Sequence, residues 1–179
     1  MIRVDYLHSC ILPSYYIFSI LSIGTTRLLD LARTYCCKNF VYASSSSVYG
    51  SSPKEELTED DVVDNPVSPY AATKKSCELL AYTFHHLYGL SCIGLRFFTV
   101  YGPWGRPDMA LFKFTKAIVN GDPIDVYNHG KMFRDFTYVD DLVRGIRLLI
   151  DTPPDRICQP QTDLPEGCKD SLSPVAPFR

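Results

Sequence analysis

The sequence predicts an α/β fold, in which helices pack against a parallel β-sheet. Short apolar segments at residues 40–43 and 91–98 are typical of strands that are buried on both faces of a sheet. A segment with apolar residues at helical spacing precedes each of them, and a helix joined to a strand by a short connection is the repeating unit of such sheets. The length of 179 residues suits one ordinary domain with a buried core.

The first half of the chain predicts two helices around one strand. We expect a helix over residues 25–37 with a threonine at its start, followed by the strand at 40–43. Residues 51–69 are acidic and contain prolines, which indicates a surface loop. A second helix is expected over residues 70–88, where Gly89 would end it.

The second half predicts a strand, two further helices and a tail. After the strand at 91–98, an amphipathic helix begins near residue 110 and ends at Gly121 and Pro123. Residues 124–130 suggest a short strand and a turn. Asp140 or Asp141 would cap the last helix. Residues 151–179 are rich in proline and lack apolar periodicity, so we expect loop or disorder there.

Composition excludes several classes of function. The net charge is −2 and no basic block occurs, so we expect no nucleic-acid partner. Seven cysteines form no CxxC pair and no metal-like spacing with histidine, which favours reduced thiols in a cytoplasmic protein without a metal. The divergent segment 1–27 is apolar, but its apolar run is shorter than the ~20 residues of a membrane helix. We therefore expect no membrane association.

Tyr70 and Lys74 form the most informative pair in the sequence. Positions i and i+4 lie on one face of a helix, so both side chains can point into one cleft. A tyrosine titrates near pH ~10, and a nearby cation favours the phenolate and moves its pKa toward the working range. A serine hydroxyl from the run at 44–47, directly after the first strand, could hold the substrate oxygen whose proton the tyrosine removes. Tyrosine and lysine at this spacing are common, however, and serine runs are usually turns.

Three blocks of sequence give these residues a context. They are FVYASSSSVYG with YAATKK, then GLRFFTVYGPWGRPDM, and finally GKMFRDFTYVDDL. Together they resemble the extended short-chain dehydrogenase/reductases that act on sugar nucleotides as NAD-dependent epimerases and dehydratases. The middle block is most similar to the UDP-glucuronate 4-epimerases. The resemblance covers residues 28–150 and implies a truncated, Rossmann-like, three-layer fold with part of a small substrate-binding lobe.

The resemblance also implies what is missing. Members of this family begin with a strand and a glycine-rich turn whose amides meet the cofactor pyrophosphate at a helix N-terminus. No GxxGxxG or GxGxxG occurs here, and the first glycine is Gly24. The chain is therefore expected to be a fragment of a longer family member, cut at both ends.

The family's functional residues can be carried over position by position. The resemblance implies that Ser45, Tyr70 and Lys74 are the catalytic residues and that NAD is the cofactor. By resemblance, further cofactor contacts would come from Ser44, Phe97 and Phe98, in addition to Tyr70 and Lys74. Substrate contacts would come from Ser45, Ser46, Ser47, Thr99, Arg106, Val126, Tyr127 and Arg134, among which Thr99 and Arg106 would hold a sugar carboxylate, Val126 and Tyr127 the base, and Arg134 the diphosphate.

The expected reaction is the interconversion of UDP-glucuronate and UDP-galacturonate through a transient 4-keto sugar. Related dehydratases carry acidic residues where Ser46 and Ser47 stand, so simple epimerisation is favoured. Two alternatives stay open. The chain could be an inactive or binding-only remnant, because the pyrophosphate turn is missing, or an epimerase of another UDP-sugar. Relatives often form dimers through the tyrosine-bearing helix, so a homodimer is possible.

Overall fold

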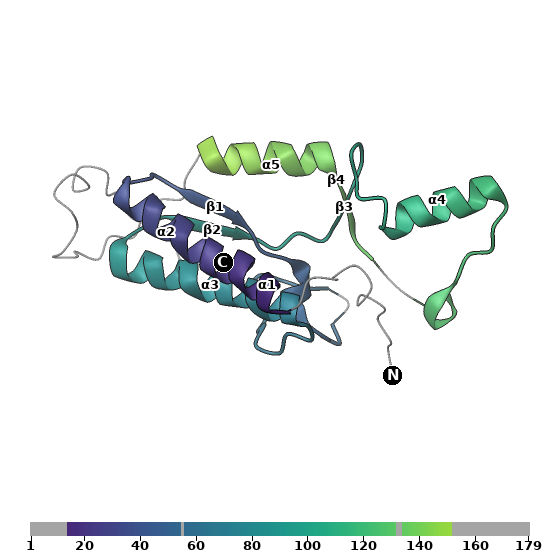
Figure 1. Cartoon of the computed structure of the whole chain (residues 1–179), viewed down its shortest axis with the longest axis horizontal. Coiled ribbons are helices and arrows are strands. Elements are labelled where there is room, and N and C mark those ends of the chain that lie inside the picture. Colours follow the sequence, from purple (N-terminus) through teal and green to yellow (C-terminus); the bar gives the residue numbers. More distant parts are fainter. Residues whose placement is uncertain (1–13, 55, 132–133, 152–179) are drawn as a thin grey trace. The chain divides into compact units, whose positions relative to one another are not determined.

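A computed structural model describes residues 14–54, 56–131 and 134–151 (Figure 1). The described part of the chain divides into a larger unit, residues 14–97 with 146–151, and a smaller unit, residues 98–145. Each unit is described by itself below. The predictions for the first thirteen residues and for the proline-rich tail lie outside the described residues.

The larger unit begins with a nearly continuous helical segment. Helix α1 (Ser14–Phe18) passes through a π-helical turn (Ser19–Ile23) into helix α2 (Gly24–Thr34). The helix predicted at 25–37 is therefore present, but the predicted threonine cap is wrong. The backbone of Ile23 is already helical, with φ −67° and ψ −41°, so no helix start is left to cap at that point.

Two parallel strands form the sheet of the larger unit. Strand β1 (Phe40–Ala43) pairs with β2 (Cys92–Leu95), with Phe40 opposite Cys92 and Ala43 opposite Leu95. Helix α3 (Pro69–Tyr88) lies between these strands in the sequence, and it confirms the helix predicted over 70–88. Strand, helix and parallel strand follow one another as in the expected α/β fold.

Helix α3 has well-formed ends. The Ser68 hydroxyl accepts a hydrogen bond from the amide of Ala71 at 3.1 Å, and Pro69 occupies the first turn, where no amide donor is needed. At the other end, Gly89 takes a left-handed conformation with φ 65° and closes the helix, as predicted. These ends fix which residues of the chain fall on the helix.

The core of the larger unit lies between the helices and the sheet. Figure 1 shows α2 and α3 running alongside β1 and β2. The buried cluster joins side chains from α2, α3 and the β2 region, with aromatic residues of β1 packed against it: Leu29, Ala32, Ala81, Leu90 and Cys92, with Phe40 and Tyr42. Burial of this apolar surface stabilises the unit and holds α3 against the sheet.

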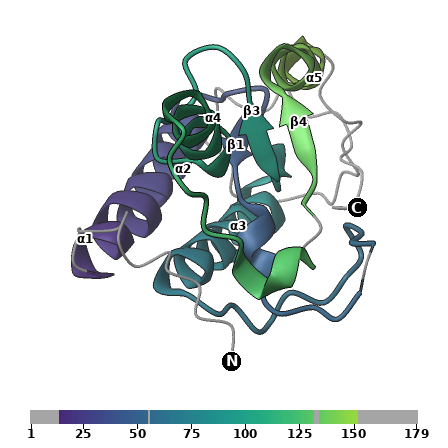
Figure 2. The same ribbon diagram turned by 90° about the vertical axis from the view of Figure 1, so that its right-hand side faces the viewer.

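The smaller unit holds a second pair of parallel strands. Strand β3 (Thr99–Tyr101) pairs with β4 (Phe136–Tyr138), and Figure 2 shows the two side by side. Helix α4 (Ala110–Asn120) ends at Gly121, which has φ 73°, as predicted. The strand expected within residues 124–130 is absent from the described residues, and a 3₁₀ turn (Tyr127–Gly130) is found there instead.

Helix α5 (Val139–Asp151) continues from the smaller unit into the larger one. Asp140 and Asp141 lie inside its first turn, so the prediction that one of them precedes the helix as a cap is wrong. In the first turn, their negative charges still favour the positive end of the helix dipole. Within the larger unit, the Asn39 amide donates to the carbonyl oxygen of Leu149 at 3.1 Å.

The cysteines differ in part from the expectation of reduced thiols. Cys37, Cys77 and Cys92 are free, but Cys36 is disulfide-bonded, so the expectation is wrong for this residue. Among the helices described, none is both long enough and apolar enough to cross a membrane.

Candidate active site

A turn of serines closes the carboxyl end of strand β1. Residues Ser46–Tyr49 form one 3₁₀ turn, and Ser45 caps it. The Ser45 hydroxyl oxygen accepts two hydrogen bonds, from the Ser47 amide at 3.2 Å and from the Ser47 hydroxyl at 2.9 Å. We call residues 44–50 the serine turn.

The bonds of Ser45 define what its hydroxyl can still do. A hydroxyl has two acceptor lone pairs and one donor. Both acceptor sites of Ser45 face Ser47, so the O–H donor can point to a ligand oxygen. The hydroxyl of Ser47 donates to Ser45 in the described structure and so helps to orient the predicted catalytic serine, while its own contact with a substrate stays a prediction.

Tyr70 and Lys74 lie on one face of α3, as predicted. The ammonium nitrogen of Lys74 is 5.8 Å from the centroid of the Tyr70 ring. Tyr70 is 37% exposed, and none of the described residues forms a hydrogen bond with its phenol oxygen. The Tyr70 side chain is therefore accessible to a ligand, and its ring lies beside the charge of Lys74.

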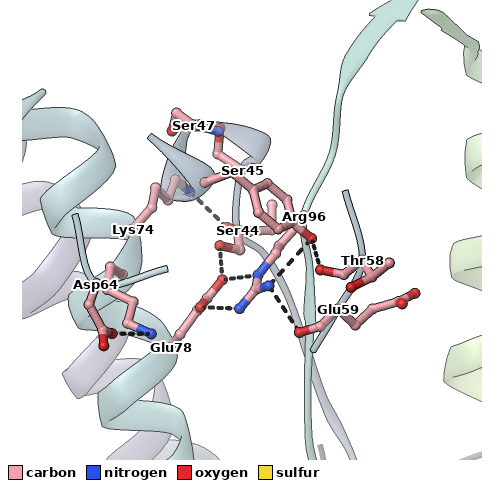
Figure 3. Close-up of polar contacts among 12 residues, drawn as sticks. Ser44, Ser45, Ser47, Thr58, Glu59, Asp64, Lys74, Glu78 and Arg96 are labelled. Carbon is pink, nitrogen blue, oxygen red and sulfur yellow. Dashed lines mark hydrogen bonds and ion pairs between the residues drawn. The ribbon is translucent and has the colours of Figure 1, made fainter. Parts of the chain in front are cut away.

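Lys74 connects this pair to the end of β1. Its ammonium group donates a hydrogen bond to the carbonyl oxygen of Ala43 at 2.8 Å, two residues before Ser45 (Figure 3). Burial lowers the pKa of Lys74, because the charged form loses solvation. Of the three ammonium donors, one is used by Ala43, which leaves donors for a ligand hydroxyl. The larger unit thus brings the three predicted catalytic residues to one end of its sheet.

Sequence reasoning missed an ion pair beside these residues. Glu78 of α3 and Arg96, just after β2, form two parallel hydrogen bonds of 3.0 Å each. The Ser44 hydroxyl donates to the same carboxylate at 2.5 Å, and Ser44 is only 3% exposed (Figure 3). The spacing of Glu78, four residues after Lys74, was the available signal. Nothing in the sequence indicated that Arg96 would meet it.

Ser44, Ser46 and Phe97 were also predicted to contact ligands. The Ser44 hydroxyl is directed at Glu78, and a contact between Ser44 and a cofactor stays a prediction. The Ser46 amide donates to the carbonyl oxygen of Phe97 at 2.9 Å, which ties the serine turn to the segment after β2. Phe97 is half-buried, and its predicted cofactor contact is likewise untested, as is that of Phe98, which belongs to the smaller unit.

The predicted substrate residues lie mostly on the smaller unit. Thr99 begins β3 and is half-buried, whereas the side chains of Val126 and Arg134 are exposed. Tyr127 begins the 3₁₀ turn, and its side chain is not described. Their contacts with a sugar nucleotide therefore stay predictions.

Arg106 already holds a carboxylate. Its guanidinium group forms a two-pronged pair with Asp108, in which Nε donates to Oδ1 at 3.0 Å and Nη2 donates to Oδ2. The hydrogen bonds from Arg106 hold the pKa of Asp108 below its usual range. The Arg106 side chain is 66% exposed. The loop thus presents a planar fork whose geometry suits a carboxylate.

Comparison with known proteins places these features in a family. The model of the NAD-dependent epimerase/dehydratase family matches residues 7–158. A probable UDP-glucuronate 4-epimerase of Rhizobium meliloti is 51% identical over 157 residues, which cover 88% of this chain and 45% of that protein.

Two solved structures share the fold. A UDP-glucuronic acid 4-epimerase from Bacillus cereus, in complex with UDP-glucuronic acid and NAD, has a TM-score of 0.68 and 36% identity, over 75% of this chain and 42% of that one. A UDP-N-acetylglucosamine 4-epimerase from Methanobrevibacter ruminantium M1 has a TM-score of 0.75 and 30% identity, over 85% and 50%. The predicted Rossmann-like fold is confirmed.

The matched region is only part of these relatives. The chain spans less than half the length of the curated relatives it matches, for example 46% of a Staphylococcus aureus protein to which it is 54% identical.

Proposed function

Because the chain belongs to the NAD-dependent epimerase/dehydratase family, we propose that it carries the catalytic residues of a sugar-nucleotide 4-epimerase that interconverts UDP-glucuronate and UDP-galacturonate. The observation that supports this reaction is the arrangement of Tyr70, Lys74 and the serine turn at one end of the sheet. The relatives named above support the choice of substrate.

In the proposed mechanism, each of the three residues has one task. The free O–H donor of Ser45 holds the oxygen on C4 of the sugar. The phenolate of Tyr70 takes the proton of that hydroxyl and later returns it, acting as base and then as acid. The ammonium group of Lys74 holds a positive charge 5.8 Å from the centroid of the Tyr70 ring, where it offsets the negative charge that develops during the proton transfer.

The described residues include side chains suited to binding the nicotinamide half of NAD. Lys74 and Tyr70 would hold the nicotinamide ribose, since both have donors or acceptors left for its hydroxyls. A glycine-rich turn for the pyrophosphate does not occur in the described part of the chain, where the first glycine, Gly24, lies within the α1–α2 helical segment. When bound, NAD would accept a hydride from C4 of the sugar and return it to the opposite face.

The uronate is favoured over neutral sugars by the loop around Arg106. Its guanidinium fork pairs with a carboxylate in the structure, namely that of Asp108. A substrate carboxylate would compete with Asp108 for the same donors. By fixing that carboxylate, Arg106 would also protect the 4-keto intermediate, a β-keto acid, from loss of carbon dioxide.

Calorimetry with NAD, in the presence and absence of UDP-glucuronate, tests the proposal on the purified 179-residue chain. Turnover is then followed by separating UDP-glucuronate from UDP-galacturonate. Micromolar NAD binding with turnover supports the proposal. A folded chain that binds the sugar nucleotide without turnover supports the binding-only alternative, and one that binds neither ligand overturns the proposal.

A second substrate class has a specific observation in its favour, the similarity to the UDP-N-acetylglucosamine 4-epimerase. Turnover of that sugar nucleotide at a higher kcat/KM than UDP-glucuronate would favour it. A cytoplasmic location and a homodimer are proposed on family grounds alone. Sedimentation of the chain at several concentrations tests the dimer.

A further inference from the structure

Glu78 continues the face of α3 that carries the proposed catalytic pair. Tyr70, Lys74 and Glu78 are spaced by four residues each, so they follow one another along one side of the helix. The side chain of Glu78 is 14% exposed and that of its partner Arg96 is 20% exposed, so the pair is largely removed from water. Such a pair keeps a definite geometry only when its remaining hydrogen-bonding groups are also satisfied.

The serine turn supplies these remaining partners at both of its ends. At the start of the turn, the Ser44 hydroxyl donates to Glu78 at 2.5 Å. At its end, the guanidinium of Arg96 contacts the phenol oxygen of Tyr49 at 3.4 Å and lies 5.1 Å from the centroid of its ring. Ser45 stands between these two attachment points. The same ion pair therefore touches the turn on each side of the proposed catalytic serine (Figure 3).

Further bonds hold the outer side of the ion pair. Nη1 of Arg96 also donates to the carbonyl oxygen of Glu59 at 3.4 Å, and the Tyr49 hydroxyl donates to that of Thr58 at 3.0 Å. The loop after the serine turn is thereby tied to the same guanidinium. Directly beyond Arg96, the Phe97 carbonyl receives the Ser46 amide. The position of the turn is thus fixed by side chains as well as by backbone bonds.

We propose that Glu78 and Arg96 are positioning residues, which fix Ser45 relative to Tyr70 and Lys74 by clamping the serine turn onto α3. In this proposal, the pair acts through the serine turn and not through a contact of its own with a ligand. Its catalytic meaning rests on the proposed function, but the clamp is a property of the folded chain and can be measured without turnover.

Hydrogen exchange of the serine-turn amides, followed by NMR on the full chain without ligands, tests the clamp directly. The probes are the amides of Ser46 and Val48, which are bonded within the turn region. In Glu78→Gln, their protection should fall about tenfold or more, as expected when hydrogen bonds to a charged group are weakened. The amides of α2 should keep their protection within twofold.

A second variant keeps the test decisive if Glu78→Gln fails to fold. Ser44→Ala leaves the ion pair and its contact with Tyr49 intact and removes the link at the start of the turn, so a smaller loss of protection, about threefold, is expected at Ser46 and Val48. The matched control is Asp64→Asn, because Asp64 pairs with Lys75 of the same helix at 3.7 Å but has no bond to the turn. Unchanged protection in Ser44→Ala, or an equal loss throughout the larger unit, would overturn the proposal.

Measurements of kcat and KM then test the positioning role of the clamp separately from the proposed function. If the wild-type chain turns over UDP-glucuronate, Arg96→Lys should lower kcat about tenfold and leave KM within twofold, because lysine keeps the charge but loses the two-pronged geometry. A variant with wild-type kcat would contradict the positioning role. A wild-type chain without turnover would contradict the proposed function alone, and the exchange data would still decide the clamp.

Discussion

At the scale of single residues, the larger unit separates the proposed acid–base group from its support. The phenol of Tyr70 is accessible and has no hydrogen-bond partner among the described residues, whereas Lys74 is anchored to Ala43. The anchored ammonium group keeps its charge beside the Tyr70 ring and leaves the phenol oxygen accessible to a ligand. The phenol oxygen of Tyr70 is therefore the atom at which the proposed acid–base role can be tested.

Replacement of that oxygen gives the sharpest test of the mechanism. Tyr70→Phe should lower kcat by about 10²–10⁴-fold, the usual contribution of a general acid–base group, and leave binding of the sugar nucleotide within about threefold. The matched control is Tyr82→Phe, an exposed tyrosine on the same helix, which should keep wild-type kcat. Steady-state kinetics and calorimetry measure both quantities. Equal losses in the two variants would remove Tyr70 from its role.

Arg106 carries the prediction about substrate choice. Arg106→Ala should weaken binding of UDP-glucuronate by about tenfold or more, since a charge-assisted pair is lost, and should leave UDP-glucose almost unaffected. Calorimetric titration with each nucleotide provides the comparison. If both nucleotides lose affinity equally, Arg106 does not recognise the carboxylate.

Asp108 provides an independent check of the same fork. Asp108→Asn removes the internal carboxylate that occupies Arg106, so UDP-glucuronate should bind more tightly, by severalfold, in this variant. The same titrations measure the change. Weaker binding in Asp108→Asn would mean that Asp108 orients Arg106 instead of competing with the substrate.

At the scale of secondary-structure elements, the serine turn depends on the backbone of Gly50. Gly50 has a φ of 62°, and a Cβ at this position would collide with the backbone carbonyl oxygen of Asn65. A left-handed conformation alone disfavours other residues, and a backbone contact cannot be relieved by a side-chain rotation. The turn therefore requires glycine for two separate reasons.

A series of alanine substitutions separates these reasons. Gly121→Ala, at φ 73° with open space around it, should cost about 1 kcal/mol of unfolding free energy, whereas Gly50→Ala should cost about 2–4 kcal/mol. Gly145→Ala, inside α5 with open space, should be neutral or stabilising by up to about 1 kcal/mol. Denaturant unfolding gives the three values. A cost at Gly50 no larger than at Gly121 would exclude the backbone collision.

At the scale of the whole molecule, burial is distributed unequally between the two units. Every described residue that is fully buried belongs to the larger unit, while α4 and α5 contain none. Local stability follows buried apolar contacts, because segments without them open at a small cost in free energy. The larger unit should therefore be the more stable part of the chain.

Hydrogen exchange of the whole chain, followed by mass spectrometry of its peptides, measures this difference. Peptides from α2, α3 and β2 should stay protected for at least tenfold longer than peptides from α4. Added UDP-glucuronate should slow exchange around residues 99–106 if the smaller unit binds the sugar. Equal protection of α3 and α4 in the free chain would contradict the prediction.

The sequence by itself determined the main helices of the larger unit and the placement of Tyr70 and Lys74 on one helix face. The helical periodicity of α3 and the glycine stops at Gly89 and Gly121 are local signals, and the structure confirms them. The spacing of Tyr70 and Lys74 placed both on one helix face, because that geometry depends only on the helical repeat. Three ordered motifs were sufficient to indicate the family that the comparisons confirm.

Tertiary structure alone decided which distant groups meet. Thr25 could not cap a helix that had already begun, and no local signal showed that the preceding residues are helical. The pairing of Glu78 with Arg96, eighteen positions apart, and of both with the serine turn, depends on how α3 packs against β1 and β2. Local spacing fixes which face of a helix a residue occupies. Only packing of the apolar core determines what lies opposite that face.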